Sequence, residues 1–131
     1  MILVTGAAGF IGSNLVAALV ASGEHEIIAC DHFGDGDKWQ NIAKHELADV
    51  IDPEDIFYFL DEHDGGVDAI FHMGAISSTT ETDVDLIIRN NFKLSLNLWN
   101  SCAAHQVPFI YASSAATYGD RTKGFDDDGS C

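Results

Sequence analysis

The sequence lacks the marks of secreted, disulfide-bonded and membrane proteins. Its three cysteines, Cys30, Cys102 and Cys131, form no CxxC motif and no paired spacing, which argues against a disulfide framework. The longest apolar run, residues 15–21, is far too short to cross a bilayer, and no signal peptide precedes the first apolar segment. We therefore expect reduced thiols in a cytoplasmic chain without a membrane segment.

Positive charge is also scarce. The 131 residues include 6 lysines and arginines against 21 aspartates and glutamates, which gives a formal net charge of −15. Nucleic acids and anionic membranes attract basic surfaces, so this balance argues against both as partners. It does not exclude an anionic cofactor, because a nest of backbone amides binds phosphate whatever the charge elsewhere.

A metal motif and internal repeats are missing as well. His45-Glu46 begins like the HExxH motif of zinc proteases, but position 49 is aspartate, and the six histidines are scattered. We therefore expect no metal site. The length and an apolar fraction of 47% indicate one folded domain over residues 1–131, without a linker or a low-complexity segment.

What the sequence does have is a glycine-rich turn near its start. A strand-forming segment runs directly into three evenly spaced glycines, Gly6, Gly9 and Gly12. Residues 13–23 follow with a helical pattern, and Asp31 closes a second strand nineteen residues after Gly12. A strand, a glycine turn and a helix N-terminus make an anion site, and an acid near this offset is typical of ribose binding. The alternative is an ordinary turn whose glycines only permit close packing.

Strands and helices alternate along the rest of the chain. Apolar patterns predict strands over residues 2–5, 26–31, 46–50, 68–73 and 108–114, and helices over residues 13–23, 52–64 and 82–105. This alternation predicts an α/β fold, a Rossmann-like doubly wound parallel sheet with helices on both faces. The carboxyl ends of the strands then share one edge, which is expected to carry residues 6–12, Asp31, Asp49, residues 73–77, Ser113 and Ser114.

Three polar side chains have two interpretations each. Lys38 lies seven residues after Asp31 in a turn-rich loop, and it either reaches the same part of a ribose or is a solvated surface charge. Asn90 and Asn91 interrupt the apolar pattern of the longest predicted helix. Either one of them is held by backbone or ligand, since a buried polar group needs a partner, or both face solvent.

These motifs resemble those of a known family. The T-G-x-x-G-x-x-G pattern of residues 5–12 resembles the fingerprint of the extended short-chain dehydrogenases/reductases, the NAD-dependent epimerases and dehydratases of sugar nucleotides. Within that family, residues 71–81 and 111–119 resemble the ADP-L-glycero-D-manno-heptose 6-epimerases. The resemblance covers essentially the whole chain, but only the amino-terminal part of the family's proteins.

The resemblance implies an activity and its partners. The enzymes that it points to interconvert ADP-D-glycero-D-manno-heptose and ADP-L-glycero-D-manno-heptose by transient oxidation with bound NADP, in the synthesis of a lipopolysaccharide core precursor. It therefore implies an ADP-heptose substrate and NADP as the cofactor, with NAD as the alternative. It also implies that the full-length protein is a homo-oligomer.

Site residues follow from the same resemblance. Cofactor contacts carried over position by position fall on Gly6, Gly9, Phe10, Ile11, Gly12, Asp31, His32, Lys38, Met73, Gly74, Ala75, Ile76, Ser77 and Asn90, and the wider superfamily adds Asp49. Ser114 matches the active-site serine, which hydrogen-bonds the reacting sugar oxygen beside a catalytic tyrosine. Pro53 departs from the pattern, which has a lysine near the cofactor phosphate.

The larger departure is a missing Tyr-x-x-x-Lys motif. Residues four apart share a helix face, so the lysine of that motif lowers the pKa of the tyrosine and holds the nicotinamide ribose. Here Tyr118 is followed by Lys123, five residues on and across a turn, and we expect Tyr118 to pack under the last strand instead. The family's carboxy-terminal half and substrate lobe are expected beyond Cys131.

Two classes of function are therefore open. The first is a sugar-nucleotide epimerase, represented here by its cofactor-binding half. The second is an NAD(P)-binding module without catalysis, and within the first class another sugar-nucleotide epimerase or dehydratase is the alternative to the heptose enzyme.

Overall fold

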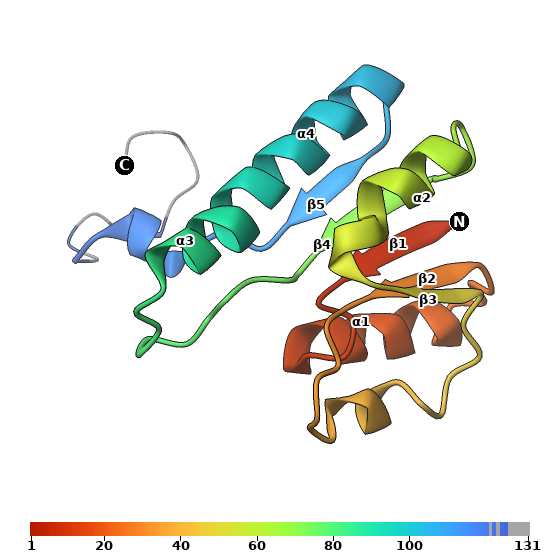
Figure 1. Ribbon diagram of the computed structural model, residues 1–131, viewed down its shortest axis with the longest axis horizontal. Helices are drawn as coiled ribbons and strands as arrows, with labels where there is room; N and C mark the ends of the chain where they lie inside the picture. Colours follow the sequence, from red (N-terminus) through yellow and green to blue (C-terminus); the bar gives the residue numbers. More distant parts are fainter. Residues whose placement is uncertain (121, 123, 126–131) are drawn as a thin grey trace.

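A five-stranded parallel sheet forms the centre of the molecule (Figure 1). The computed structural model describes residues 1–120, 122, 124 and 125. The strands are β1 (Ile2–Thr5), β2 (Ile27–Cys30), β3 (Asp49–Ile51), β4 (Ala69–His72) and β5 (Phe109–Tyr111). Their order is β3-β2-β1-β4-β5, and all neighbouring pairs are parallel. This is the strand order of a doubly wound sheet, so the predicted Rossmann-like α/β fold is confirmed.

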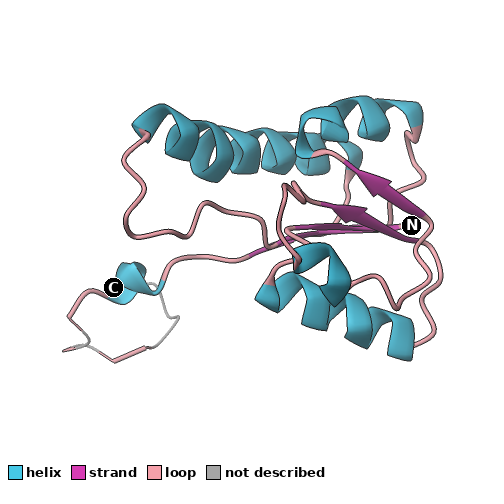
Figure 2. Ribbon diagram, turned by 60° about the horizontal axis from the view of Figure 1, so that its bottom comes forward, coloured by secondary structure: helices cyan, strands magenta, loops and turns pink. Residues whose placement is uncertain are grey.

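Helices cover both faces of the sheet (Figure 2). They are α1 (Phe10–Ala21), α2 (Ile56–Glu62), α3 (Val84–Ile87) and α4 (Leu94–His105), with a π-helical segment (Ile88–Lys93) between the last two and 3₁₀ turns at Lys38–Asn41, Pro53–Asp55 and Ala115–Tyr118. α1 lies on one face, and α2 and α4 lie on the other. None of the helices in the described part of the chain is long and apolar enough to span a bilayer.

Alternate residues of β1 contribute to two separate apolar cores. Leu3 packs in the core under α2 and α4, together with Ile70 and Leu98. Val4 packs in the core under α1, together with Val16. All five residues are at most 1% exposed. Burial on both faces explains the continuous apolar sequence of β1, and it fixes the glycine turn at the centre of one sheet edge.

The third strand differs from the prediction. The pattern predicts residues 46–50, but β3 is Asp49–Ile51, and its register pairs Asp49 with Ile28 of β2. Asp49 therefore lies at the amino end of β3, and Asp52 follows its carboxyl end. β3 is an edge strand with two exposed side chains, and so little burial leaves almost no alternation from which to infer the register.

The longest predicted helix, residues 82–105, is divided. It begins after Asp83, whose side chain accepts a hydrogen bond from the backbone N–H of Leu86 at 3.0 Å, as an N-cap does. Between α3 and α4 the backbone widens into the π-helical segment, which carries Asn90 and Asn91. Such widened turns frequently occur at functional sites.

Candidate functional site

The carboxyl ends of β1, β2 and β4 lie on the side of the sheet where α1 begins (Figure 1). Residues at and beyond these ends line a crevice. It consists of two adjoining cavities of about 160 and 310 Å³. Among the predicted cofactor contacts, the inner cavity is lined by Gly6, Asp31, His32, Lys38, Gly74, Ala75, Ile76 and Asn90. The outer cavity shares His32, Pro53, Asn90 and Leu94 with it. Five separate segments of the chain thus meet at one place.

Two of the three glycines are required by backbone packing. Gly6 has a φ of +63°, and a Cβ on it would lie 2.7 Å from the Cα of Gly74. A Cβ on Gly12 would lie 2.1 Å from the carbonyl oxygen of Gly6. No side chain fits at these distances, so the close-packing interpretation holds for both positions.

Gly9 is different. Its backbone is extended, with φ −70° and ψ 173°, a conformation open to any residue. A Cβ on Gly9 would meet only the Gly6 oxygen, at 3.2 Å. Apart from this one tight contact the space beside Gly9 is open, which suits a site where a phosphate approaches the backbone closely.

The N-terminus of α1 begins at this open space without a cap. No side chain caps the helix at Gly9, and its first turn contains no acidic residue. The first N–H groups of a helix have no intrahelical partner, and the helix dipole favours negative charge there. Phe10 and Ile11 in this turn are 86% and 61% exposed. The turn fits the pyrophosphate of a dinucleotide, which would supply acceptors for these N–H groups.

Asp31 forms the next wall of the crevice and is held from two sides. Its carboxylate is 9% exposed and accepts a hydrogen bond from the Ala8 backbone N–H at 2.9 Å. The Lys38 ammonium binds the other carboxylate oxygen at 2.7 Å. Asn41 anchors the same loop, since its side-chain amide donates to the Ala8 carbonyl oxygen at 2.8 Å. Lys38 is therefore folded back onto Asp31 and offsets its charge.

The outer cavity carries further charged groups. His32 pairs with Asp52 at 2.9 Å, so the acid after β3 that reaches this edge is Asp52 and not the predicted Asp49. Arg89 lines the outer cavity with Glu54, and it has no ion-pair partner within 4.0 Å among the described residues. An unpaired guanidinium in such an acidic chain is available to an anionic or aromatic ligand.

The loop after β4 is held by Asn91. The Asn91 side chain accepts from the Ile76 backbone N–H at 2.7 Å and donates to the Ile76 carbonyl oxygen at 2.9 Å. Asn90 donates to the Leu86 carbonyl oxygen at 2.9 Å and lines both cavities. Both asparagines bond backbone, but only Asn91 holds the loop after β4, whereas Asn90 bonds within its own helix and lines the crevice. Met73 and Ser77, which flank this loop, do not line either cavity.

The thiols are unreactive groups in this arrangement. Burial, together with the nearby charges of Asp31 and Asp52, raises the pKa of Cys30 to about 12, and burial also raises the pKa of Cys102. A thiol that stays protonated is a poor nucleophile and a poor metal ligand. Within the described ranges, no group of three or more histidine, cysteine or acidic side chains is placed to hold a metal ion. Cys131 lies outside the described residues.

Ser114 is not brought to the crevice. It is exposed, it precedes the 3₁₀ turn Ala115–Tyr118, and its hydroxyl accepts from the Ala116 N–H at 3.3 Å. The prediction that Tyr118 packs under the last strand is not met, because its ring packs edge-to-face on Phe125 with the ring centroids 5.4 Å apart. Lys123 lies outside the described residues.

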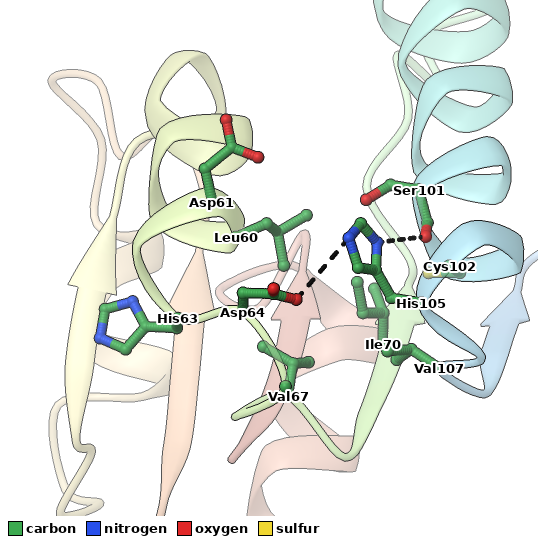
Figure 3. A pocket seen from close by; sticks show the side chains of 11 residues that line it. Leu60, Asp61, His63, Asp64, Val67, Ile70, Ser101, Cys102, His105 and Val107 are labelled. Carbon is green, nitrogen blue, oxygen red and sulfur yellow. Dashed lines mark hydrogen bonds and ion pairs between the residues drawn. The ribbon is translucent and has the colours of Figure 1, made fainter.

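A third cavity lies at the opposite end of β4, between the last residues of α2 and α4 (Figure 3). It has a volume of about 140 Å³, and His105 points toward Asp64 across it. The two side chains are 3.7 Å apart and 51% and 74% exposed. His105 also donates to the Ser101 carbonyl oxygen at 2.8 Å. An exposed and distant pair of this kind is worth little as a binding or catalytic unit.

Several residues around the crevice were not identified from the sequence. Thr5, His72 and Ser95 connect its loops through side-chain hydrogen bonds, and Arg89 and Asp52 line or border its outer part. Among the residues that hold these loops, only Asn91 was indicated by the sequence, as a polar residue in an apolar helix. The roles of the remaining residues depend on contacts between segments that are distant in the sequence, so only the folded structure reveals them.

Solved structures with the same fold include enzymes of sugar-nucleotide chemistry. UDP-glucuronic acid 4-epimerase from Bacillus cereus in complex with NAD is 29% identical with a TM-score of 0.73, and the match covers 91% of this chain and 41% of that one. UDP-N-acetylglucosamine 4-epimerase from Methanobrevibacter ruminantium M1 is 25% identical with a TM-score of 0.78 over 97% and 42% of the two chains. A mutated uronate dehydrogenase is 27% identical with a TM-score of 0.64 over 87% and 39%.

The chain thus spans less than half the length of these proteins. The sequence pattern of one family matches it almost from end to end, over residues 2–130. Together with the strand order and the glycine turn at the crevice, this match establishes that the chain belongs to the NAD dependent epimerase/dehydratase family.

Proposed function

We propose that the crevice binds NAD(P) and that this chain is the cofactor-binding part of a sugar-nucleotide epimerase. The observation that carries the proposal is the uncapped start of α1 beside the open space at Gly9, next to a crevice that Asp31 and Lys38 border. Backbone amides at Phe10 and Ile11 hold the pyrophosphate, because the Gly9 N–H already donates to the Gly6 carbonyl oxygen at 3.0 Å. The Asp31–Lys38 pair meets the adenosine ribose. His32 and Asn90 form the walls further out, and the Gly74–Ile76 loop takes the nicotinamide side.

NADP is the proposed cofactor, although the solved relatives named above include a complex with NAD. A carboxylate after the second strand usually binds a free 2′-hydroxyl and repels a 2′-phosphate. Here the Lys38 ammonium lies 2.7 Å from the Asp31 carboxylate and offsets that repulsion. Arg89 adds a second cation to the adjoining cavity, which Pro53 also lines.

The proposed reaction is the interconversion of ADP-D-glycero-D-manno-heptose and ADP-L-glycero-D-manno-heptose. The nicotinamide, when bound, supplies a hydride acceptor and donor. The resemblance gives Ser114, which does not line the crevice, the role of orienting the sugar oxygen, and a base must take the hydroxyl proton. The described residues contain no Tyr-x-x-x-Lys, since Thr122 stands four residues after Tyr118. The base therefore belongs to a part of the enzyme outside these residues, and the 131-residue chain alone turns over no substrate.

Resemblance in residues 71–81 and 111–119 supports the heptose substrate. The likeness to UDP-sugar 4-epimerases favours a second candidate, epimerisation of a UDP-sugar. Incubating a full-length enzyme that contains this chain with ADP-heptose and with UDP-glucuronic acid, and following the stereocentres by NMR, separates the two. Conversion of UDP-glucuronic acid alone would replace the heptose assignment. If neither sugar is inverted although NADP binds tightly, the result favours the alternative function, an NAD(P)-binding module without catalysis.

Calorimetric titration of the 131-residue chain tests the cofactor part of the proposal. We expect NADP to bind, NAD to bind more weakly, and ADP-heptose with NADP to show no epimerisation. Absence of binding for both dinucleotides would refute the crevice as a cofactor site.

A further inference from the structure

A buried chain of hydrogen bonds runs behind the crevice, through His72 at the carboxyl end of β4. The His72 side chain is 4% exposed, and its ring stacks on Phe109 at 5.9 Å. Its Nδ1 lies 2.6 Å from the Thr5 hydroxyl, and its Nε2 lies 2.8 Å from the Ser95 hydroxyl. Both ring nitrogens of His72 are therefore hydrogen-bonded, one to β1 and the other to α4.

The direction of every proton in this chain is determined. The Ser95 hydroxyl donates to the Asn91 carbonyl oxygen at 3.0 Å, so its oxygen must accept from His72 Nε2–H. A neutral imidazole carries one N–H. Nδ1 is therefore the acceptor, and the Thr5 hydroxyl donates to it. Burial lowers the pKa of His72, which keeps the ring neutral.

The Thr5 oxygen then has a free lone pair, and it accepts the backbone N–H of Gly74 at 3.1 Å. At this point the two loops of the crevice touch, since a Cβ on Gly6 would lie only 2.7 Å from the Gly74 nitrogen. Without an acceptor at position 72, the Thr5 hydroxyl can rotate and direct its proton elsewhere. The contact between the glycine turn and the loop after β4 therefore depends on a side chain that lines neither cavity.

We propose that His72 is a positioning residue for the dinucleotide site: by accepting the Thr5 proton it aims the Thr5 oxygen at Gly74 and fixes the separation of the two loops that border the crevice. The inference rests on the proposed cofactor function. The hydrogen bond from His72 to Ser95, the Ser95 arm, has a different role from the one between His72 and Thr5, the Thr5 arm. The Ser95 arm holds α4 and fixes the orientation of the His72 ring.

Two substitutions of His72 each keep one of these hydrogen bonds and remove the other. In His72→Asn, the side-chain oxygen takes the place of Nδ1 and keeps the Thr5 arm, but the side chain is too short for Ser95. In His72→Gln, the terminal amide takes the place of Nε2 and keeps the Ser95 arm, but leaves no acceptor for Thr5. Both remove a buried ring from the contact with Phe109, so we expect similar losses of melting temperature.

The test compares the affinity for NADP, by calorimetry, with the hydrogen-exchange protection of the Gly74 amide. We expect His72→Asn to bind within about threefold of the wild type and His72→Gln to bind roughly tenfold more weakly, the size of one lost hydrogen bond. The hydrogen-exchange protection of the Gly74 amide should fall in His72→Gln and persist in His72→Asn. It should also fall in Thr5→Val, which removes the hydroxyl itself. Equal loss of affinity and of Gly74 protection in both position-72 variants would overturn the proposal.

A second readout needs no cofactor. In ¹⁵N-histidine spectra of the wild type, we expect the His72 signals of a neutral ring with the proton on Nε2. A proton on Nδ1 would overturn the hydrogen-bond directions on which the proposal depends. If the wild type binds no dinucleotide, the cofactor function fails, whereas the Gly74 amide and these spectra still decide the role of His72 in placing the loops.

Discussion

The strand β4 has a cavity near each end, and the two differ in which helix ends surround them. The crevice at its carboxyl end lies at the side of the sheet where α1 begins. The cavity at its amino end, shown in Figure 3, lies between the last residues of α2 and α4. Helix N-termini present N–H groups and positive potential, whereas C-termini present carbonyl oxygens and negative potential. One parallel sheet therefore makes one edge receptive to phosphate and the other edge unreceptive.

The side chains of the two cavities also differ, in their burial and in how firmly they are held by partners. At the carboxyl edge, Asp31 is nearly buried and both its oxygens are bound, at 2.7 and 2.9 Å. At the amino edge, His105 and Asp64 are exposed and 3.7 Å apart. A histidine–aspartate pair is the more familiar catalytic combination, yet burial and fixed partners favour the other end as the proposed site.

The largest effect should come from Gly12→Ala, which tests whether the glycine turn requires the close approach of residue 12 to the Gly6 carbonyl oxygen. The added Cβ would lie 2.1 Å from the Gly6 oxygen, so the turn must move, and we expect a loss of roughly 3–5 kcal/mol in the free energy of unfolding. Urea denaturation measures it. A urea denaturation curve equal to that of the wild type would mean that the turn has room for a Cβ at position 12.

Gly9→Val should weaken cofactor binding without unfolding the protein. Its backbone conformation accepts a side chain, but the methyls fill the open space at the start of α1. We expect the Kd for NADP to rise by about 100-fold, with a melting temperature close to that of the wild type. Calorimetry on the folded variant gives the answer, and unchanged affinity would remove this turn from the site.

Lys38→Ala should discriminate between the two cofactors. Loss of the ammonium leaves Asp31 uncompensated, so we expect NADP to bind about tenfold more weakly and NAD to change by less than about threefold. Lys44→Ala is the matched control, because Lys44 is an exposed cation that does not line the crevice. Equal losses for both cofactors would reduce Lys38 to a structural partner of Asp31.

A pH dependence follows from His72. Burial lowers its pKa in the folded state, so below about pH 6.5 the unfolded chain binds the proton and the folded chain resists it. Stability carried by this group is therefore present above that pH and lost as the pH falls. Between pH 7 and pH 5 we expect the wild type to lose a few degrees more in melting temperature than His72→Asn. Parallel curves would show that His72 titrates as freely as in the unfolded chain.

The smallest effect is expected at the amino edge. Asp64→Asn and His105→Gln break an exposed pair, and we expect changes within about 0.5 kcal/mol in unfolding free energy and none in NADP affinity. A clear loss of affinity from either variant would contradict the assignment of the site to the carboxyl edge.

The features of the molecule that were predictable from the sequence are those encoded locally. The alternation of apolar strands and helices gave the fold, and the glycine turn followed by Asp31 indicated the crevice, because each signal lies within about one βαβ unit. The register of β3 was missed because an exposed edge strand has little apolar alternation. Asp49 was therefore placed at the wrong end of its strand.

Other features depend on tertiary contacts. Which of Asn90 and Asn91 holds the loop after β4 depends on the π-helical segment between α3 and α4, which a helical pattern does not reveal. The pairing of Thr5 with His72 joins residues 67 positions apart. The location of Ser114 depends on what packs beside the end of β5, and among the described residues it remains exposed.

Titration of NADP into the ¹⁵N-labelled chain, followed at every backbone amide, decides whether the carboxyl edge of the sheet and not the amino edge binds a dinucleotide. We expect saturable shifts at residues 9–12 and 74–76 and none at Asp64, His105 or Val107. Shifts confined to the second group, or no shift at either edge at millimolar NADP, would contradict binding at the carboxyl edge.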